Sequence, residues 1–253
     1  MRNKPKRNII LFLVEGKSDR EALQGPIQEL YDRKDENNEV VFRIINEEEA
    51  ESGGDVTTRA GVYPENIEAK INKLFLGNFF KVNGLNARDI SEIIQIVDTD
   101  GVYIPNDAVR EKEEQSGGSS TFYDDKTINC SNASNIIRRN EHKRKNLDYL
   151  ISLKRITIRQ FPLPYSIYYF SCNLDHFLHN SANLEPRMKR SLASVFADNF
   201  IDNPDGFVNI ISGDPSAVTG MNYGESWNYI KDDLNSLQRH TNLNILLDKI
   251  VSI

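Results

Sequence analysis

The chain has 253 residues, of which 31 are lysine or arginine and 37 are aspartate or glutamate, so its formal net charge is −6. A chain of this length can bury a substantial hydrophobic core, either as one large domain or as one domain with a small addition. The negative charge excludes a globally basic surface for nucleic acid, so any such contact must come from local basic patches.

Several features predict a cytoplasmic location and no membrane partner. The two cysteines, Cys130 and Cys172, are too few for a disulfide framework and suit a reducing compartment. No apolar run approaches the length of a membrane span. The basic residues 1–7 lead directly into a predicted strand and do not form a signal-peptide pattern.

Four apolar runs rich in β-branched residues predict buried strands, with amphipathic helices between them. The first helix is expected after Ser18, whose spacing to Glu21 matches a capping box, and is expected to kink or restart at Gly25 and Pro26. A second helix is expected after Pro64. This alternation predicts an α/β fold: a mostly parallel, Rossmann-like sheet with helices on both faces. The predicted strands are residues 9–13, 40–45, 93–97 and 167–170.

The stretch at about residues 102–146 interrupts the alternation. It contains a Gly/Ser tract at residues 115–120, flanked by charged and asparagine-rich sequence with little periodicity, which predicts a long flexible insertion. Its end carries the densest basic cluster of the chain. That cluster is either an arm that contacts phosphates or a solvated helix face. Its members are Arg138, Arg139, Lys143, Arg144 and Lys145.

Helical apolar stripes replace the strands from about residue 181 onward. They begin at Met188, Trp227 and Leu243, and they are expected to pack against the sheet or against a second copy of the chain. We therefore divide the chain into an α/β domain, residues 1–180, and a helical C-terminal part, residues 181–253.

Two short acidic motifs each follow a predicted strand. Glu15 and Asp19 come after the first strand, and Asp98 and Asp100 come directly after the third. The carboxyl ends of the strands are where open parallel sheets bind ligands. Carboxylates gathered there repel one another unless a cation neutralises them, and oxygen ligands of this kind suit Mg²⁺ or Mn²⁺. The motifs therefore predict a divalent-metal site.

In this order and strand context, the two motifs resemble the TOPRIM domain of topoisomerases, bacterial primases, small ribosomal-RNA maturases and nucleases of the overcoming-lysogenisation-defect type. The resemblance covers roughly residues 8–180. It implies catalytic and metal-binding roles for Glu15, Asp98 and Asp100, with Asp19 as a supporting carboxylate. Some nuclease-like relatives have an acidic residue after the fourth strand that completes a second metal site. Asp175 is the matching candidate, although the glutamate often found in those relatives is missing here.

Each candidate also has a purely structural interpretation. Glu15 and Asp19 could complement or close the start of the first helix. Asp98 and Asp100 could form an Asx turn at the end of the strand. Asp55, on a glycine-rich loop after the second strand, could form a turn or serve as a further ligand at the same sheet edge.

The resemblance implies a nuclease that uses Mg²⁺ or Mn²⁺ to hydrolyse phosphodiester bonds of DNA or RNA. Within that family the chain resembles small freestanding TOPRIM nucleases of bacterial phage-defence and abortive-infection systems, which suggests a partner ATPase or sensor protein. Lys17 and the basic cluster are the predicted nucleic-acid contacts. Two alternatives stay open: a non-catalytic binding or regulatory subunit of a multiprotein defence complex, and a phosphotransfer enzyme acting on a small nucleotide.

Overall fold

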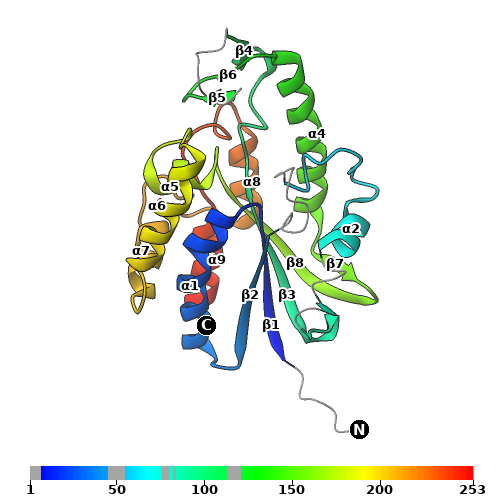
Figure 1. Cartoon of the computed structure of the whole chain (residues 1–253), viewed down its shortest axis with the longest axis vertical. Helices are drawn as coiled ribbons and strands as arrows, with labels where there is room; N and C mark the ends of the chain where they lie inside the picture. The colour runs from blue at the N-terminus through cyan, green and yellow to red at the C-terminus, as the bar shows by residue number, and fades with distance from the viewer. Residues whose placement is uncertain (1–6, 45–54, 76–79, 82–83, 113–120, 253) are drawn as a thin grey trace.

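The computed structural model describes residues 7–44, 55–75, 80–81, 84–112 and 121–252 of the chain (Figure 1). Its central sheet consists of β1 (Asn8–Val14), β2 (Asn38–Ile44), β3 (Ile90–Asp98), β7 (Arg155–Ile158) and β8 (Phe161–Phe170). The strand order is β2-β1-β3-β8-β7. Every neighbouring pair is parallel except β7 and β8, which form an antiparallel hairpin at one edge. The predicted α/β class with a mostly parallel sheet is therefore confirmed.

Residues of β1 alternate between two hydrophobic clusters, one on each face of the sheet. Ile9 and Leu11 lie in the first cluster and Ile10 and Phe12 in the second, and none of the four is more than 2% exposed. This is the period-two alternation of a strand that is covered on both sides. Burial on both sides explains why the sequence of this strand is a continuous apolar run.

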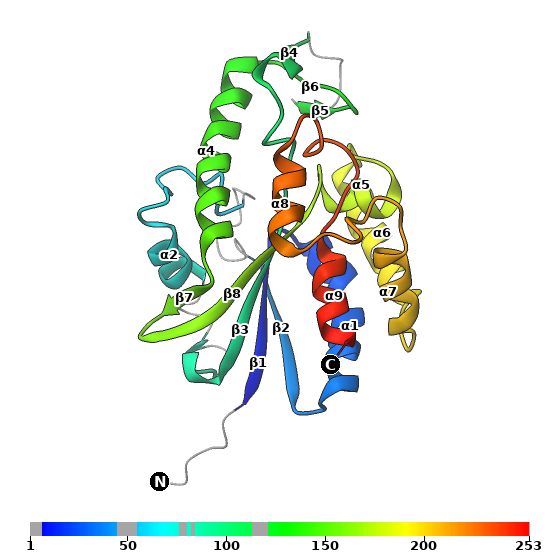
Figure 2. The same ribbon diagram turned by 180° about the vertical axis from the view of Figure 1, so that it is seen from behind.

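Helices cover both faces, with α1 and α6 on one side of the sheet and α4 on the other (Figures 1 and 2). The first cluster includes residues of α2 (Ile67–Lys70), the π-helical turn η1 (Ile71–Phe75), α4 (Ala133–Ser152) and α8 (Tyr223–Lys231). The second includes residues of α1 (Lys17–Lys34), α5 (Leu174–His179), α6 (Pro186–Asp198), α7 (Pro204–Ser212) and α9 (Leu243–Val251). The C-terminal part thus contributes to both clusters. Among the described residues, no helix has the length and apolar character needed to cross a membrane.

Residues 102–146 hold more regular structure than the sequence indicates. A small second sheet forms from β4 (Val109–Glu111), β5 (Thr121–Tyr123) and β6 (Ile128–Cys130). The expectation of an irregular insertion does not hold for residues 133–146, because they belong to α4. The buried residues of this helix include Asn140, Lys143 and Asn146, and these polar residues hide its apolar periodicity. The Gly/Ser tract at residues 115–120 lies outside the described residues.

The helix boundaries differ from the expectations in two places. α1 is one helix that passes through Gly25 and Pro26 without restarting; Pro26 is buried, and packing of this face offsets the hydrogen bond that proline cannot donate. The apolar stripe that begins at Trp227 predicts a helix that includes Leu234 and Leu237, but α8 ends at Lys231, so these two residues lie in the turns that follow it.

The fourth parallel strand is longer than predicted. β8 begins at Phe161, whereas the sequence predicts a start at Ile167. Pro162 and Pro164 obscure the first half of the strand, because proline cannot donate a hydrogen bond to a ladder. Both prolines pair only with β7, since the pairing of β8 with β3 starts at Tyr165. The prolines therefore lie in a part of the strand that has one partner.

Candidate metal centre

The two acidic motifs meet at the carboxyl edge of the sheet. β1 and β3 are neighbouring parallel strands, so Glu15, directly after β1, lies beside Asp98, the last residue of β3. Glu15 Oε1 accepts a hydrogen bond of 3.1 Å from the backbone N–H of Asp98. Asp98 Oδ1 in turn accepts a bond of 3.0 Å from the backbone N–H of Leu174, at the start of α5. The fold thus joins the ends of three neighbouring strands around these two carboxylates.

The turn after β3 carries Asp100 and is tied to the end of β8. Asp100 and Gly101 both have positive φ values, 50° and 66°, a conformation that glycine adopts freely and aspartate tolerates. The backbone N–H of Asp100 donates to the carbonyl of Cys172 at 2.8 Å, and that of Thr99 donates to the carbonyl of Phe170 at 3.0 Å. These bonds fix the turn that bears the second aspartate of the motif.

A single residue of the C-terminal part, Ser236, holds the same turn from the other side. Its carbonyl accepts hydrogen bonds from the hydroxyl of Thr99 at 2.6 Å and from the backbone N–H of Gly101 at 3.0 Å. Its hydroxyl accepts a bond of 3.0 Å from the backbone N–H of Tyr103. Ser236 and Thr99 are both 0% exposed, so water cannot replace these bonds.

Replacing Thr99 by valine tests this attachment. Thr99→Val keeps the shape of the side chain but removes the donor to Ser236, so we expect a loss of about 1 kcal/mol of stability. For a chain of this size that corresponds to a fall in Tm of about 2–4 °C, measurable by calorimetry. Thr99→Ser keeps the hydroxyl and is the control. A fall for the serine variant but not for the valine variant would show that the methyl group matters and the hydroxyl does not.

Lys143 of α4 lies among three of the carboxylates. Its Nζ atom is 2.7 Å from Asp100 Oδ2, 3.1 Å from Asp55 Oδ2 and 3.8 Å from Glu15 Oε1, and its side chain is 0% exposed. Burial alone would lower the pKa of Lys143, but these carboxylates outweigh it and raise that pKa well above its usual value. Burial would likewise raise the pKa of Asp100, yet Lys143 and Arg139 hold it below the usual range. Lys143 and Asp100 therefore form a tight ion pair.

Glu15 and Asp98 are in the opposite electrostatic situation. Burial, followed by repulsion from Asp55, raises the pKa of Glu15 well above its usual value, although Lys143 opposes the shift. Burial, followed by repulsion from Asp19 and Asp100, raises the pKa of Asp98 well above its usual value. In both residues burial is the largest cause and disfavours the charged form, so a bound cation would stabilise the ionised carboxylates.

Asp19 and Asp175 lie on the α5–α6 side of this edge. Asp19 Oδ2 accepts a hydrogen bond of 2.8 Å from the backbone N–H of Gly16, the N-cap of α1, so Asp19 has the reciprocal capping role that the sequence predicts for Glu21, and Gly16 replaces Ser18 as the N-cap. Burial raises the pKa of Asp19 against that hydrogen bond, and repulsion from Asp175 adds to the rise. Asp175 is 7% exposed and forms a salt bridge of 2.7 Å with Lys189 of α6. All five predicted metal residues therefore belong to one electrostatically connected group.

The predicted nucleic-acid contacts separate into buried and exposed residues. Lys143 cannot be a surface phosphate contact as predicted, because its ammonium is enclosed by carboxylates. Arg139 donates to the backbone carbonyl of Asp100 at 3.1 Å, and Arg144 donates to that of Val102 at 2.9 Å. The exposed members are Lys17 of α1 and Arg138 and Lys145 of α4.

The sequence contained a signal for the position of Lys143. Leu147 and Leu150 follow it at helical spacings of four and seven residues, and both are 0% exposed. Residues at these spacings share one face of a helix, so Lys143 belongs to the buried face. The burial of Lys143 was not predicted, because Lys143 belongs to a basic cluster and runs of charged residues normally face solvent.

The chemistry of the donor set fits a divalent cation. The side chains are carboxylates, the ligands that Mg²⁺ and Mn²⁺ prefer, and burial raises the pKa values of Glu15 and Asp98, a cost to the charged forms that a bound cation would offset. Within the part of the chain that the structure describes, no three acidic, histidine or cysteine side chains are already arranged to hold a metal. Glu15 and Asp98, with Asp19 in support, are the residues that would hold one.

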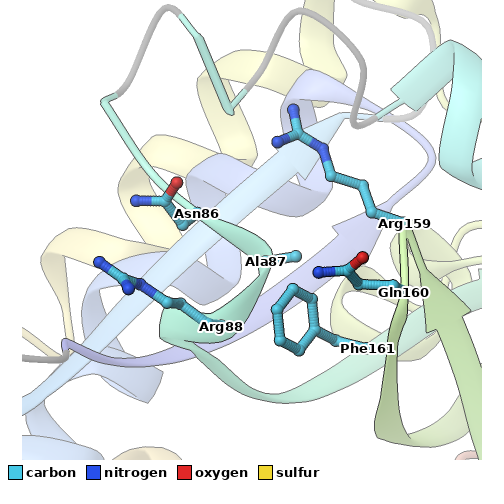
Figure 3. A pocket seen from close by; sticks show the side chains of 6 residues that line it. All are labelled: Asn86, Ala87, Arg88, Arg159, Gln160 and Phe161. Carbon is cyan, nitrogen blue, oxygen red and sulfur yellow. The ribbon is translucent and has the colours of Figure 1, made fainter.

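A separate pocket lies at the opposite edge of the sheet (Figure 3). It has a volume of about 440 Å³ and is formed by residues 86–88, before β3, and residues 159–161, at the β7–β8 turn. Arg88 and Arg159 contribute side chains to it, and the guanidinium of Arg159 also lies over the ring of Phe80 at 4.8 Å. None of the predicted site residues lines this pocket.

Comparisons with known proteins do not supply a relative. No protein-family model, curated protein or solved structure matches the chain. The resemblance to TOPRIM proteins therefore depends on the acidic residues and on the strands that they follow.

Proposed function

We propose that the protein is a nuclease of the TOPRIM kind that uses Mg²⁺ or Mn²⁺ to hydrolyse phosphodiester bonds of DNA or RNA. One observation carries the proposal. Glu15 and Asp98 follow neighbouring parallel strands, share a hydrogen bond at the carboxyl edge and have pKa values raised by burial and by other carboxylates. Strongly perturbed carboxylates at such an edge are typical of functional sites.

The residues of the site have separate tasks in this proposal. A bound divalent cation would act as a Lewis acid on the phosphodiester and stabilise the leaving oxygen. Glu15 and Asp98 bind that cation, and Asp19 orients the start of α1 beside them through Gly16. Asp100 holds the ammonium of Lys143 and keeps the turn after β3 in place.

The biological setting is proposed from the resemblance. The freestanding TOPRIM proteins that these motifs resemble act in phage defence and abortive infection. We therefore propose an effector role, with a partner ATPase or sensor protein as its trigger.

A cleavage assay tests the proposed activity. The chain is incubated with plasmid DNA, single-stranded DNA or transfer RNA, with Mg²⁺, with Mn²⁺ or with a chelator. We expect at least one polymer to be cleaved in the presence of metal and none in the presence of chelator. The polymer that is cleaved identifies the substrate. Glu141→Gln, an exposed carboxylate of α4, is the control and should cut at the wild-type rate. Cleavage that persists in chelator would contradict the metal-dependent mechanism.

The exposed cations Lys17, Arg138 and Lys145 are proposed to contact the polymer backbone. Arg138 and Lys145 are seven residues apart in α4, so they lie on the same face. Replacing all three by alanine should make the dependence of log Kd on log salt shallower by about 2–3 for duplex DNA. Binding titrations over a range of salt concentrations measure this slope. An unchanged slope would contradict the assignment.

The control for this experiment removes three exposed cations in the last turns of α1 and α9. They are Arg33, Lys34 and Lys249. Their loss should leave the slope unchanged, because they lie away from the carboxyl edge. A phosphotransfer enzyme acting on a small nucleotide would lose little activity in either triple variant.

One observation favours a second function. Lys143 forms salt bridges with both Asp55 and Asp100 without a metal, as expected in a site whose carboxylates have become structural. The protein would then be a non-catalytic binding or regulatory subunit of a larger complex. Failure to cut any polymer, combined with failure to bind Mn²⁺, is the result that would favour this alternative.

A further inference from the structure

Lys143 supplies a positive charge inside the carboxylate group. Its ammonium forms salt bridges with Glu15, Asp55 and Asp100, which come from three separate segments of the chain. In a two-metal centre, two divalent cations about 3.5–4 Å apart neutralise a comparable set of carboxylates. Here the Lys143 ammonium lies among three such carboxylates.

α4 positions this lysine together with the loop that bears Asp55. Asn146 lies on the same buried face as Lys143 and donates through Nδ2 to the carbonyls of Thr57 at 2.9 Å and Val62 at 3.1 Å. Asp55 itself accepts hydrogen bonds from the backbone N–H of Thr57, at 2.9 Å, and from its hydroxyl. One helix therefore holds both the ammonium and the loop, so Asp55 and Lys143 approach each other without a metal.

Asp19 accepts the N–H of Gly16 as a helix cap, and the other five carboxylates at this edge divide into two groups. Asp55, Asp100 and Asp175 each form a salt bridge of 3.1 Å or less with a lysine. Asp98 forms none with the residues that the structure describes, and Glu15 reaches a lysine only at 3.8 Å. Among the described carboxylates of this edge that do not cap a helix, Glu15 and Asp98 are therefore the two without a close lysine partner, and a divalent cation could bind between them.

We infer that Lys143 takes the place of a second divalent cation, so that the centre binds a single metal ion on Glu15 and Asp98. The inference rests on the proposed function, because it assigns the metal stoichiometry of that same site. Lys143 is a positioning residue: its fully buried ammonium holds Asp55 and Asp100 and does not contact the substrate.

Metal stoichiometry tests the inference without reference to activity. Equilibrium dialysis with Mn²⁺ should give one ion per chain for the wild-type protein. Lys143→Met removes the charge at nearly constant length, and we expect this variant to bind two ions per chain. Electron paramagnetic resonance should then show the spin coupling of a Mn²⁺ pair, which the wild-type protein lacks. Lys145→Met, an exposed lysine of the same helix, is the matched control and should still bind one ion.

A second variant keeps the test decisive if Lys143→Met does not fold. Asp55→Asn removes a partner of Lys143 and leaves Glu15 and Asp98 unchanged. It should bind one ion with a Kd close to that of the wild-type protein. If Asp55 were instead a ligand of a second ion, the wild-type protein would bind two ions and this variant one.

Two results would overturn the inference. They are two ions per chain in the wild-type protein, and one ion per chain in folded Lys143→Met. Either result leaves the proposed nuclease intact if the wild-type protein cuts with metal. Failure of the wild-type protein to bind Mn²⁺ at all would instead overturn the proposed function, and the inference with it.

Discussion

Glu15→Gln and Asp98→Asn are each expected to lower the rate of metal-dependent cleavage by about 1,000-fold. Each substitution removes one of the two carboxylates at the sheet edge that are proposed to bind the metal and whose pKa values are raised by burial. A loss of this size corresponds to about 4 kcal/mol of transition-state stabilisation, within the range that a metal ion supplies. Single-turnover assays on the polymer that the wild-type protein cuts give the rate. A loss below tenfold in both variants would contradict the assignment of the metal ligands.

The stability of the metal-free protein at different pH values distinguishes a functional role of Glu15 and Asp98 from a structural one. The pKa values of Glu15 and Asp98 are raised in the folded chain, so the stability linked to their protonation is present at low pH. This contribution to stability is lost as the pH rises from the usual carboxyl pKa through the raised pKa values of the folded protein. Without metal, the wild-type protein should therefore lose stability as the pH rises above the usual carboxyl range, and Asp98→Asn should lose less.

Thermal unfolding in chelator measures this difference. Glu141→Gln, which removes an exposed carboxylate, should follow the wild-type protein at every pH. If Glu15→Gln and Asp98→Asn lose both activity and stability without metal, the two carboxylates are structural supports and not metal ligands.

Lys143→Met is expected to destabilise the metal-free protein by about 3–5 kcal/mol. Removing one partner of a buried ion pair leaves uncompensated charge in the interior, which is the costly case. Here the unpaired charges are those of Asp55, 3% exposed, and Asp100, 24% exposed. Denaturant titration in chelator at about pH 8, where carboxylates are normally ionised, measures the loss.

Two further variants show whether charge is the cause. The double variant Lys143→Met/Asp55→Asn removes one of the unpaired carboxylates and should recover part of the lost stability. Lys189→Met breaks a comparable salt bridge with Asp175, but a third of the Lys189 side chain is exposed, so its loss should be smaller. A loss below about 1 kcal/mol for Lys143→Met would show that the carboxylates do not need the ammonium.

The position of the site could be predicted from sequence because it depends on local patterns. Glu15 and Asp98 each adjoin a continuous apolar run, and such runs form buried parallel strands whose carboxyl ends meet at one edge. The observed pairing of β1 with β3 brings these ends together. The strand context was therefore sufficient to place two residues that are 83 positions apart.

The partners of these carboxylates depend on long-range packing and could not be predicted in the same way. The helical spacing to Leu147 and Leu150 places Lys143 on the buried face of α4, but only the docking of α4 on the sheet brings it to these carboxylates. Ser236 has no distinctive sequence context, yet its carbonyl and hydroxyl hold the turn after β3. Contacts of this kind follow from how distant segments meet, and no local pattern encodes them.

Anomalous diffraction from crystals soaked in Mn²⁺ tests the central claim most directly. We expect one anomalous peak within about 2–2.5 Å of carboxylate oxygens of both Glu15 and Asp98, with Lys143 still paired to Asp100. A protein that cuts nucleic acid in the same Mn²⁺ buffer but shows no peak at these two carboxylates would contradict the account.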